Sequence, residues 1–294
     1  MSAVSGREIY LWRKAAQESA IAGSIDIQEV DWLLQEVTDL DSLALRLESF
    51  TTLPRVTVAY SLEELTELWK QRVHRRLPVQ YLVGKTNWRK WQLAVSPGVL
   101  IPRPETELMV EILRQTPIEV DSESNLVDLG TGSGAIAVSL ADSFPKAKVY
   151  AVDISSEAIE IARLNARAAK LQDRIEFYLG SWWNPLSHLK GKVTAMVSNP
   201  PYIPKGELPS LQPEVYLHEP HLALNGGDDG LDAIRNLVDT APTFLVSGGL
   251  WLVEMMAGQG SEVVRLLQQQ GEYRSIQVVP DLAKIDRFVM AYRI

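Results

Sequence analysis

The sequence predicts an α/β protein: a mostly parallel sheet of seven strands with helices on both faces, preceded by a small helical domain. Two observations predict it. From residue 125 onward, short apolar runs alternate with amphipathic helical patterns, which is typical of parallel sheets. Before residue 79 the patterns are helical. We therefore expect a helical domain over residues 1–78, a β-hairpin linker over 79–104 and the sheet domain over 105–294.

The helical domain contains two well-marked helices. One covers residues 26–40, with Asp26 as its expected N-cap and these apolar residues on one face: Val30, Leu33, Leu34 and Val37. The other begins at Ser61, where Glu64 completes a capping-box pattern, and ends at Pro78. Its last turns carry a basic cluster of Lys70, Arg72, Arg75 and Arg76. These cations are expected to be solvated and to complement the helix dipole; a partner-docking surface is the alternative.

Residues 79–104 combine short β-like pieces with a Pro-Gly turn and two prolines that flank Arg103. This pattern predicts a hairpin and a stiff connector. Arg103 could contact the carboxylate of a cofactor or pair with a neighbouring acid. A helix over 105–115 follows, with acidic residues in its first turn.

The sheet domain contains seven predicted strands and four predicted helices. The strands cover residues 125–130, 148–154, 174–180, 193–199, 249–255, 275–280 and 286–294. The helices cover residues 134–143, 155–169, 230–245 and 260–270. Parallel sheets of this kind bind ligands at the carboxyl ends of their strands, where the strand order reverses.

A glycine-rich turn follows the first strand of the sheet. Gly130, Gly132 and Gly134 allow a tight turn and close approach of a ligand at the N-terminus of the next helix. The second strand ends in Asp153, whose carboxylate could accept both hydroxyls of a ribose. An N-cap role for Asp153 is less favoured, because Ser155 follows as a better cap. This order of elements indicates an adenosine-type cofactor without saying which one.

The stretch "SNPPYIP" ends the fourth strand at the same edge of the sheet. Its prolines stop the strand and stiffen the backbone. Methyl transfer to a planar nitrogen needs such a site, because acceptors that hold the N–H groups orient the NH2 toward the electrophile. Asn199 offers its side-chain carbonyl, Pro200 its backbone carbonyl, and Tyr202 a ring that could stack on the acceptor. Asp128, just before the glycine turn, favours S-adenosylmethionine as the cofactor; a hydrogen-bonded carboxylate of the turn is the alternative.

Composition excludes several other classes of site. The chain of 294 residues has no cysteine, so disulfides and zinc-thiolate sites are excluded. Its net charge of −8 argues against a general nucleic-acid binder. We expect no metal, since "GGDDGLD" lacks calcium-loop spacing and His218 and His221 lack a third ligand nearby. With neither a signal peptide nor a membrane span expected, the predicted location is the cytoplasm.

The order "DLGTGSG", "AVDIS", "NPPY" resembles the class I amino-methyltransferases. Together with "LIPRPETE", "HEPHLALNGGDDGLD" and "GQG", it looks like the HemK/PrmC family. This resemblance implies a Rossmann-like class I methyltransferase sheet with a helical N-terminal substrate-docking domain. It also implies S-adenosyl-L-methionine as cofactor and class I peptide-chain release factors as partners. The implied reaction methylates N5 of the glutamine in their Gly-Gly-Gln motif, with no direct nucleic acid or membrane partner.

The resemblance also assigns residues by position. The implied acceptor site is Asn199, Pro200, Pro201 and Tyr202. The implied cofactor site is Gly130, Thr131, Gly132, Ser133, Gly134, Asp153, Trp182 and Asn199. Trp182 would flank the adenine, with Trp183 as the alternative.

The chain departs from the family pattern at Asn87-Trp88 and at Met255-Met256. Both pairs lie outside the chemical motif, so the departures concern local packing or partner contacts. Two other functions stay open at this point. One is an amino-methyltransferase acting on an exocyclic base nitrogen of DNA or RNA. The other is a non-catalytic protein that binds S-adenosylmethionine or interacts with the translation machinery.

Overall fold

The computed structural model describes residues 2–294, which form two compact units. The first unit holds the residues up to Gly84 together with Gln212–His218, and the second holds Lys85–Leu211 and Glu219–Ile294. The division therefore falls at Gly84 and not at Pro78, and the predicted linker is split between the two units. Among the described residues, no helix combines the length and apolar character that crossing a membrane requires.

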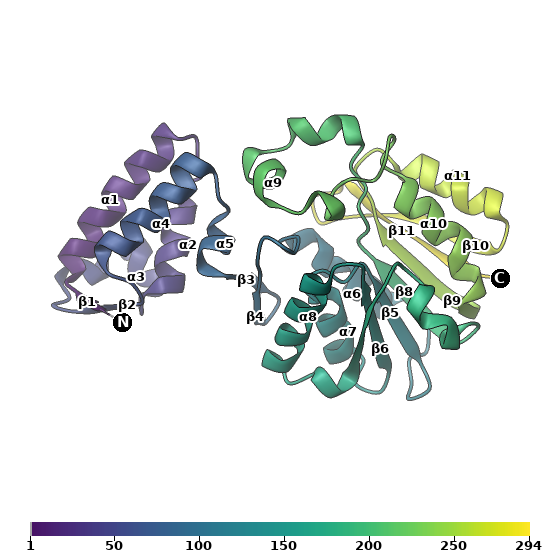
Figure 1. The fold of residues 1–294 in the computed structure, drawn as a ribbon. Helices are drawn as coiled ribbons and strands as arrows, with labels where there is room; N and C mark the ends of the chain where they lie inside the picture. The colour runs from purple at the N-terminus through teal and green to yellow at the C-terminus, as the bar shows by residue number, and fades with distance from the viewer. Residues whose placement is uncertain (1) are drawn as a thin grey trace. The chain divides into compact units, whose positions relative to one another are not determined.

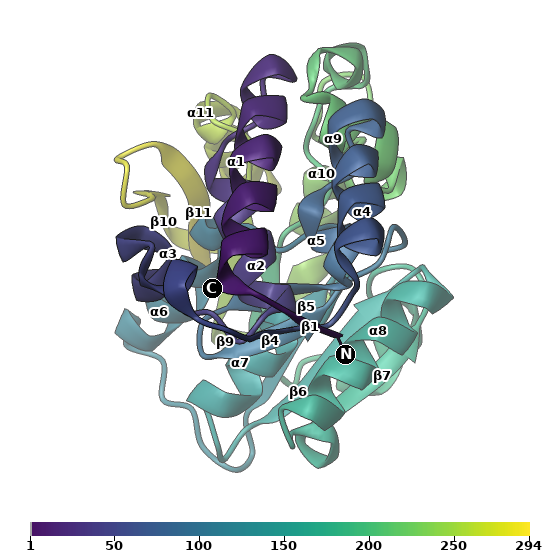
Figure 2. The same cartoon turned by 90° about the vertical axis from the view of Figure 1, so that its left-hand side faces the viewer.

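The first unit is mainly helical, and α1 and α4 lie side by side in it (Figures 1 and 2). Its helices are α1 (Gly6–Ala22), α2 (Gln28–Val37), α3 (Ser42–Leu47), α4 (Leu62–Arg75), α5 (Val79–Val83) and α9 (Pro213–His218). The four apolar residues predicted on one face of α2 are all buried in the core of this unit. Two strands, β1 (Ser2–Val4) and β2 (Val56–Val58), pair antiparallel and were not predicted. With three residues each, they are too short to show a strand period.

The predicted helix starts have different outcomes. The capping box at Ser61 and Glu64 is confirmed, because each side chain bonds the backbone N–H of the other residue. The prediction of Asp26 as N-cap of α2 is wrong, since the capping position is Ile27. The Asp26 carboxylate instead accepts from the backbone N–H of Gln28, 2.9 Å away, and so forms a local turn before the helix.

The expectation of a fully solvated basic cluster is wrong for Arg72, which is 3% exposed. Its guanidinium pairs with Glu29 of α2, and its Nη1 lies 2.7 Å from Oε1 of Glu214 in α9. Arg76 binds the same carboxylate oxygen at 2.6 Å. Buried cations need such partners, because the desolvation of an unpaired charge is costly. The two arginines thereby fix α9 within the helical unit.

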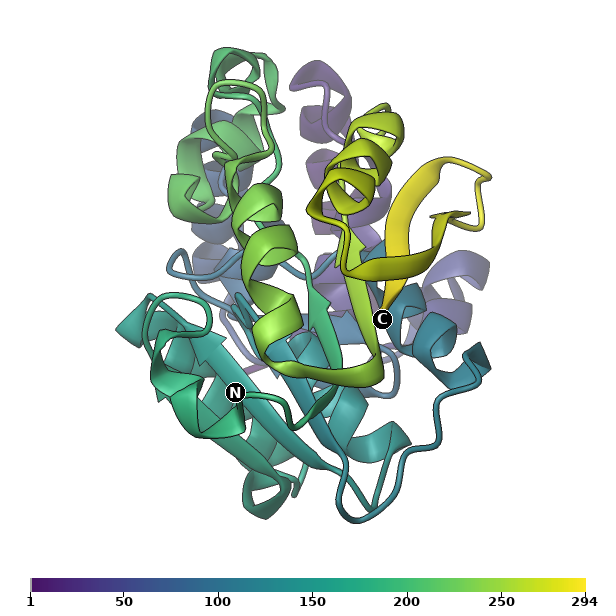
Figure 3. The same cartoon turned by 90° about the vertical axis from the view of Figure 1, so that its right-hand side faces the viewer.

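The second unit is built on a sheet with strand order β10-β11-β9-β8-β5-β6-β7. Its strands are β5 (Asn125–Leu129), β6 (Lys148–Asp153), β7 (Ile175–Leu179), β8 (Val193–Ser198), β9 (Leu245–Glu254), β10 (Tyr273–Pro280) and β11 (Asp286–Arg293). Only β11 runs opposite to its neighbours, so the predicted seven-stranded, mostly parallel sheet is confirmed. Figure 3 shows the C-terminal strands β10 and β11 in yellow.

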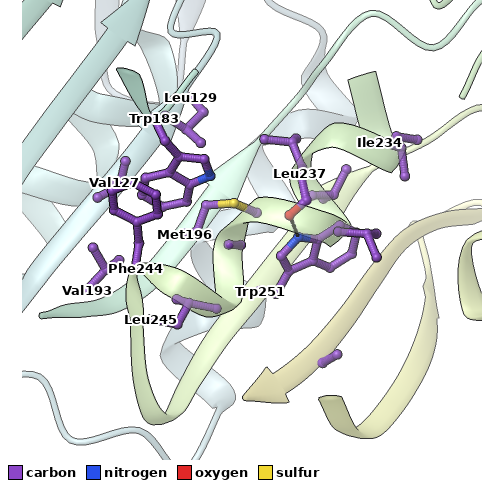
Figure 4. Packing of buried hydrophobic residues seen from close by; sticks show 14 of the residues in the cluster. Val127, Leu129, Trp183, Val193, Met196, Ile234, Leu237, Phe244, Leu245 and Trp251 are labelled. Carbon is purple, nitrogen blue, oxygen red and sulfur yellow. Dashed lines mark hydrogen bonds between the residues drawn. The ribbon is translucent and has the colours of Figure 1, made fainter. Parts of the chain in front are cut away.

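Helices cover both faces of this sheet (Figure 1). One face packs against α6 (Leu108–Gln115), α7 (Ala135–Ser143) and α8 (Ser156–Ala168), and the other against α10 (Asp232–Thr240) and α11 (Gly260–Gln270). Along β5, Leu126 faces the first group and Val127 the second, as the period of two in a strand requires. Figure 4 shows the second core, where Met196 and Trp251 of the sheet lie near Leu237 of α10.

Two predicted bounds in the sheet unit differ from the structure by four residues or more. The helix predicted over 230–245 ends at Thr240, and a 3₁₀ turn follows over Ala241–Thr243. Pro242 lies in that turn, and a proline cannot continue an α-helix without losing a hydrogen bond. As a result, β9 begins at Leu245 and is longer than the predicted strand.

The hairpin of β3 (Lys85–Trp88) and β4 (Trp91–Ala94) packs on the sheet unit. Trp88, one of the residues that depart from the family pattern, is 1% exposed and donates its indole N–H to the Ser139 hydroxyl of α7. Asn165 of α8 exchanges two hydrogen bonds with the backbone of Ala94 and donates to the carbonyl of Ser133 in the glycine turn. One buried amide therefore joins the hairpin to that turn.

Candidate active site

A cavity of about 220 Å³ lies where the strand order reverses, between the carboxyl ends of β5 and β8. Sheets of this topology place their ligands there. The walls come from the glycine turn, the ends of β6 and β8, the connector after the hairpin and the segment after α9. Of the residues predicted from the sequence, six line it: Gly130, Gly132, Asp153, Trp182, Asn199 and Pro201.

The glycine turn is fixed by bonds to the neighbouring strand. The backbone N–H groups of Gly130 and Thr131 both donate to the carbonyl of Val152 at the end of β6. Gly130, Gly132 and Gly134 all have positive φ angles, which residues with a side chain rarely adopt. Thr131, Ser133 and Gly134 shape the turn but do not line the cavity.

Gly134 is needed for a second reason, because a Cβ there would lie 2.9 Å from the Cβ of Ala162 in α8. We expect Gly134→Ala to lower the free energy of unfolding by about 2–3 kcal/mol, from the positive φ and the forced contact together. Gly271→Ala is the matched control, since Gly271 has a similar φ of +84° and open space around its Cβ. Urea unfolding of both variants measures the difference. Equal losses would contradict a role for the contact.

Asp153 lies at the end of β6 and connects the cavity with the glycine turn. Its Oδ2 accepts from the backbone N–H of Gly132 at 2.8 Å, and its Oδ1 from that of Ser155 at 2.9 Å. Burial raises the pKa of this carboxyl, while the two backbone hydrogen bonds act in the opposite direction. A carboxylate has about four acceptor sites, so both oxygens retain capacity for ligand hydroxyls. The N-cap of α8 is Ser155, as its side-chain bond to Ala158 shows.

Asp128 is fully buried beneath the turn and does not line the cavity. One of its oxygens accepts from the Thr131 hydroxyl at 2.6 Å and from the backbone N–H of Ala137 at 3.1 Å. Burial raises its pKa to about 7, and the nearby charge of Asp153 adds to the effect. Through these contacts the Asp128 side chain stabilises the glycine turn and the start of α7.

The two adjacent tryptophans have different surroundings. Trp182 lines the cavity and lies near Gly130. Trp183 is 4% exposed and stacks on Phe244, with ring centroids 4.3 Å apart (Figure 4). A ligand in the cavity can therefore reach Trp182, whereas Trp183 belongs to the apolar core.

Asn199 ends a chain of hydrogen bonds that begins at a buried acid. Its Nδ2 donates to the Thr106 hydroxyl at 3.3 Å, and that hydroxyl donates to Oε2 of Glu254 at 2.7 Å. Tyr202 donates to Oε1 of the same carboxylate at 3.1 Å. Burial raises the pKa of Glu254 to about 7, against the effect of the two hydroxyl bonds. Asn199 takes part in this network through its NH2 group, and its side-chain oxygen accepts no hydrogen bond from Thr106, Glu254 or Tyr202.

The predicted stacking of Tyr202 on an acceptor stays a prediction. Its ring packs against the core cluster drawn in Figure 4, and neither Tyr202 nor Pro200 is among the cavity-lining residues. Burial, together with the nearby Glu254 carboxylate, raises the pKa of the Tyr202 hydroxyl. In the structure this hydroxyl anchors the loop to Glu254.

Two later segments hold the backbone of the Asn-Pro-Pro-Tyr loop. The side-chain NH2 of Gln259 donates to the carbonyls of Tyr202 and Gly230, at 3.0 and 3.3 Å. Tyr202 and Gln259 can lie this close to Gly230 because it has no side chain. A Cβ at Gly230 would lie 2.3 Å from the Tyr202 carbonyl oxygen. Ile203 forms an isolated parallel bridge with Asn225. The motifs "GGDDGLD" and "GQG" thus serve to fix the loop.

Other residues singled out from the sequence have structural partners. Arg103 pairs with Glu219 at 2.7 Å, which is the neighbouring-acid alternative. "GGDDGLD" leads into α10 as a glycine turn, with Asp229 bound by Arg235. Within residues 2–294, no group of three or more His, Asp or Glu side chains is arranged to hold a metal ion.

Sequence reasoning did not select Thr106, Glu254 or Gln259 as site residues. Glu254 carried a usable signal, because it is an acid at the carboxyl end of a buried strand, at the same sheet edge as Asp153 and Asn199. Thr106 and Gln259 lie on segments whose placement beside the loop depends on the folded chain.

Comparison with known proteins gives the family. A methyltransferase small domain model matches residues 104–211. A release factor glutamine methyltransferase from Synechocystis sp. is 51% identical over 98% of this chain and 97% of its own length. A release factor glutamine methyltransferase from Thermosynechococcus vestitus is 42% identical over 98% of this chain and 99% of its own length. Among solved structures, the hMettl16 catalytic domain in complex with the MAT2A 3'UTR hairpin 6 is 11% identical and has a TM-score of 0.57, with 88% of each chain covered. This is a likeness of fold alone. The chain belongs to the release factor glutamine methyltransferase family and has the Rossmann-like sheet of class I methyltransferases.

Proposed function

We propose that the protein transfers a methyl group from S-adenosyl-L-methionine to N5, the side-chain amide nitrogen, of the glutamine in the Gly-Gly-Gln motif of class I peptide-chain release factors. Similarity to the family over nearly the whole chain supports the proposal. The observation that carries it is an asparagine on the cavity wall whose NH2 is already bound by Thr106. Its oxygen is therefore available to accept an N–H from an amide substrate.

The residues around the cavity fit an adenosyl cofactor. Asp153 has acceptor capacity for a ribose diol, and Trp182 offers a flat apolar surface for an adenine ring. Gly130 and Gly132 leave the wall free of side chains. When bound, the cofactor supplies a methyl group on a positively charged sulfur, which is a strong electrophile.

In this proposal the loop positions the substrate nitrogen. The Asn199 side-chain oxygen and the Pro200 carbonyl accept the two amide N–H groups, which turns the nitrogen lone pair toward the methyl group. Pro200 and Pro201 restrict the backbone, so little conformational freedom is lost on binding. As the N–C bond forms, the S–C bond breaks and S-adenosylhomocysteine is left; the methylated, positively charged nitrogen then releases a proton to water. No general base is needed before the transfer.

We assign the helical unit to docking of the release factor, and we expect no direct nucleic acid or membrane partner. A release-factor substrate implies work in the cytoplasm, where translation occurs. The support for this assignment is that all the cavity-lining residues belong to the sheet unit, so the helical unit contributes none of them.

The proposal is tested with labelled S-adenosylmethionine and purified release factor, its Gly-Gly-Gln glutamine either intact or changed to alanine. We expect label on the intact factor alone. Equal label on both factors would contradict the proposed acceptor. Label only on added DNA or RNA would favour a base methyltransferase instead.

A further inference from the structure

The side-chain amide of Asn199 has two possible orientations, and only one serves the proposed reaction. If the NH2 faced the substrate, it would offer a donor to a substrate group that is itself a donor. The hydrogen-bond chain behind Asn199 decides between them, and its direction can be followed from the chemistry of each member.

The chain begins at Glu254, which is fully buried and receives two hydroxyl groups. Above its pKa of about 7 the Glu254 carboxyl is mostly ionised and only accepts, so the Thr106 hydroxyl points its single hydrogen at Glu254. The Thr106 oxygen can then only accept from Asn199, and the group that donates is the NH2. Thr106 is itself 4% exposed, so water does not compete freely for its hydroxyl.

We infer that Thr106 and Glu254 are positioning residues, which act through Asn199 by turning its side-chain oxygen toward the acceptor amide. This inference rests on the proposed function for the identity of the acceptor. Tyr202 supports the arrangement by satisfying the second oxygen of Glu254. The Glu254 carboxylate need not contact the substrate. It sets the direction of both hydrogen bonds, from Thr106 to Glu254 and from Asn199 to Thr106.

The test uses the chain of 294 residues at pH 8, with Thr106→Val as the main variant. Valine keeps the shape of threonine and removes the hydroxyl, so the Asn199 amide loses its fixed orientation. We expect kcat for the release-factor glutamine to fall about tenfold, the effect of losing one neutral hydrogen bond. The Kd for S-adenosylmethionine should stay within about twofold. Thr106→Ser, which retains the hydroxyl, should restore most of the lost kcat.

A second variant tests the role of the acid. Glu254→Gln keeps the volume of the side chain but replaces an acceptor-only group with one that also donates. Because the Thr106 hydrogen then has no single required direction, we expect a fall in kcat, again without loss of cofactor affinity. Thr86→Val, in a buried threonine of the β3–β4 hairpin outside the network, is the matched control and should leave kcat unchanged.

A readout besides turnover is the pair of side-chain NH2 resonances of Asn199 in ¹H–¹⁵N spectra. In the wild type, one of these protons should be protected from solvent exchange by Thr106, and Thr106→Val should remove that protection while Thr86→Val does not. Unchanged protection and unchanged kcat in Thr106→Val would overturn the inference. If the wild type left the release-factor glutamine unmethylated, the proposed function would fail, yet the exchange data would still decide the orientation of Asn199.

Discussion

Replacing Asn199 by alanine is expected to lower kcat for methylation of the release-factor glutamine by about 10²–10³-fold. Removal of one preorganised group aimed at the reacting centre has this size of effect in other enzymes. Asn199 lines the cavity while its NH2 is held by Thr106, so alanine removes an acceptor that is aimed before the substrate arrives. Single-turnover kinetics with the release factor measure the loss.

The cofactor should still bind to this variant, because Asp153, Trp182 and the glycine turn stay intact. Calorimetric titration with S-adenosylhomocysteine is expected to give a Kd within about threefold of the wild type. The matched control is Asn236→Ala, which changes an exposed asparagine of α10 and should leave both kcat and the cofactor Kd at the wild-type values. An Asn199→Ala protein that keeps the kcat of the wild type would contradict the proposed role. A protein that binds the cofactor much more weakly, with kcat unchanged at saturating cofactor, would contradict it as well.

Replacing Asp153 by alanine is expected to weaken cofactor binding by at least about 100-fold. A hydrogen bond to a charged group contributes about 1.5–3 kcal/mol, and a ribose offers two hydroxyls to this carboxylate. The loss has a second part, since the backbone N–H of Gly132 would lose its partner and the glycine turn would be less well defined. Calorimetry with S-adenosylhomocysteine measures the affinity.

The matched control for this variant is Asp173→Ala, in an exposed acid that follows α8. Thermal unfolding of both variants shows whether the sheet unit is still folded. An Asp153→Ala protein that binds the cofactor as tightly as the wild type would remove Asp153 from the proposed ribose site. A fall in kcat with normal cofactor affinity would argue for a different role.

The parts of the fold that depend on local pattern could be predicted from the sequence. All seven strands of the sheet follow from apolar runs, and the capping box at Ser61 and Glu64 follows from spacing of three residues. The edge shared by Gly130, Asp153 and Asn199 also follows, because parallel strands place their carboxyl ends together. These features need little knowledge of distant contacts.

The parts that depend on distant contacts could not be predicted. Arg72 has the pattern of a solvated helix end, and its burial is set by Glu214, which belongs to a later segment of the chain. Thr106 and Glu254 likewise meet only after the sheet has formed. The choice between Trp182 and Trp183 depended on which ring entered the core, and adjacent residues of one type carry no periodicity that would decide this.

The insertion of α9 has an evolutionary consequence. The chain passes from one unit to the other at three points, after Gly84, after Leu211 and after His218. A gene fusion that exchanged only the N-terminal segment would leave Glu214 without Arg72 and Arg76. The two units are therefore not independent modules that recombination can shuffle with a single joint. Changes in the helical unit and in the loop that carries α9 should instead be inherited together.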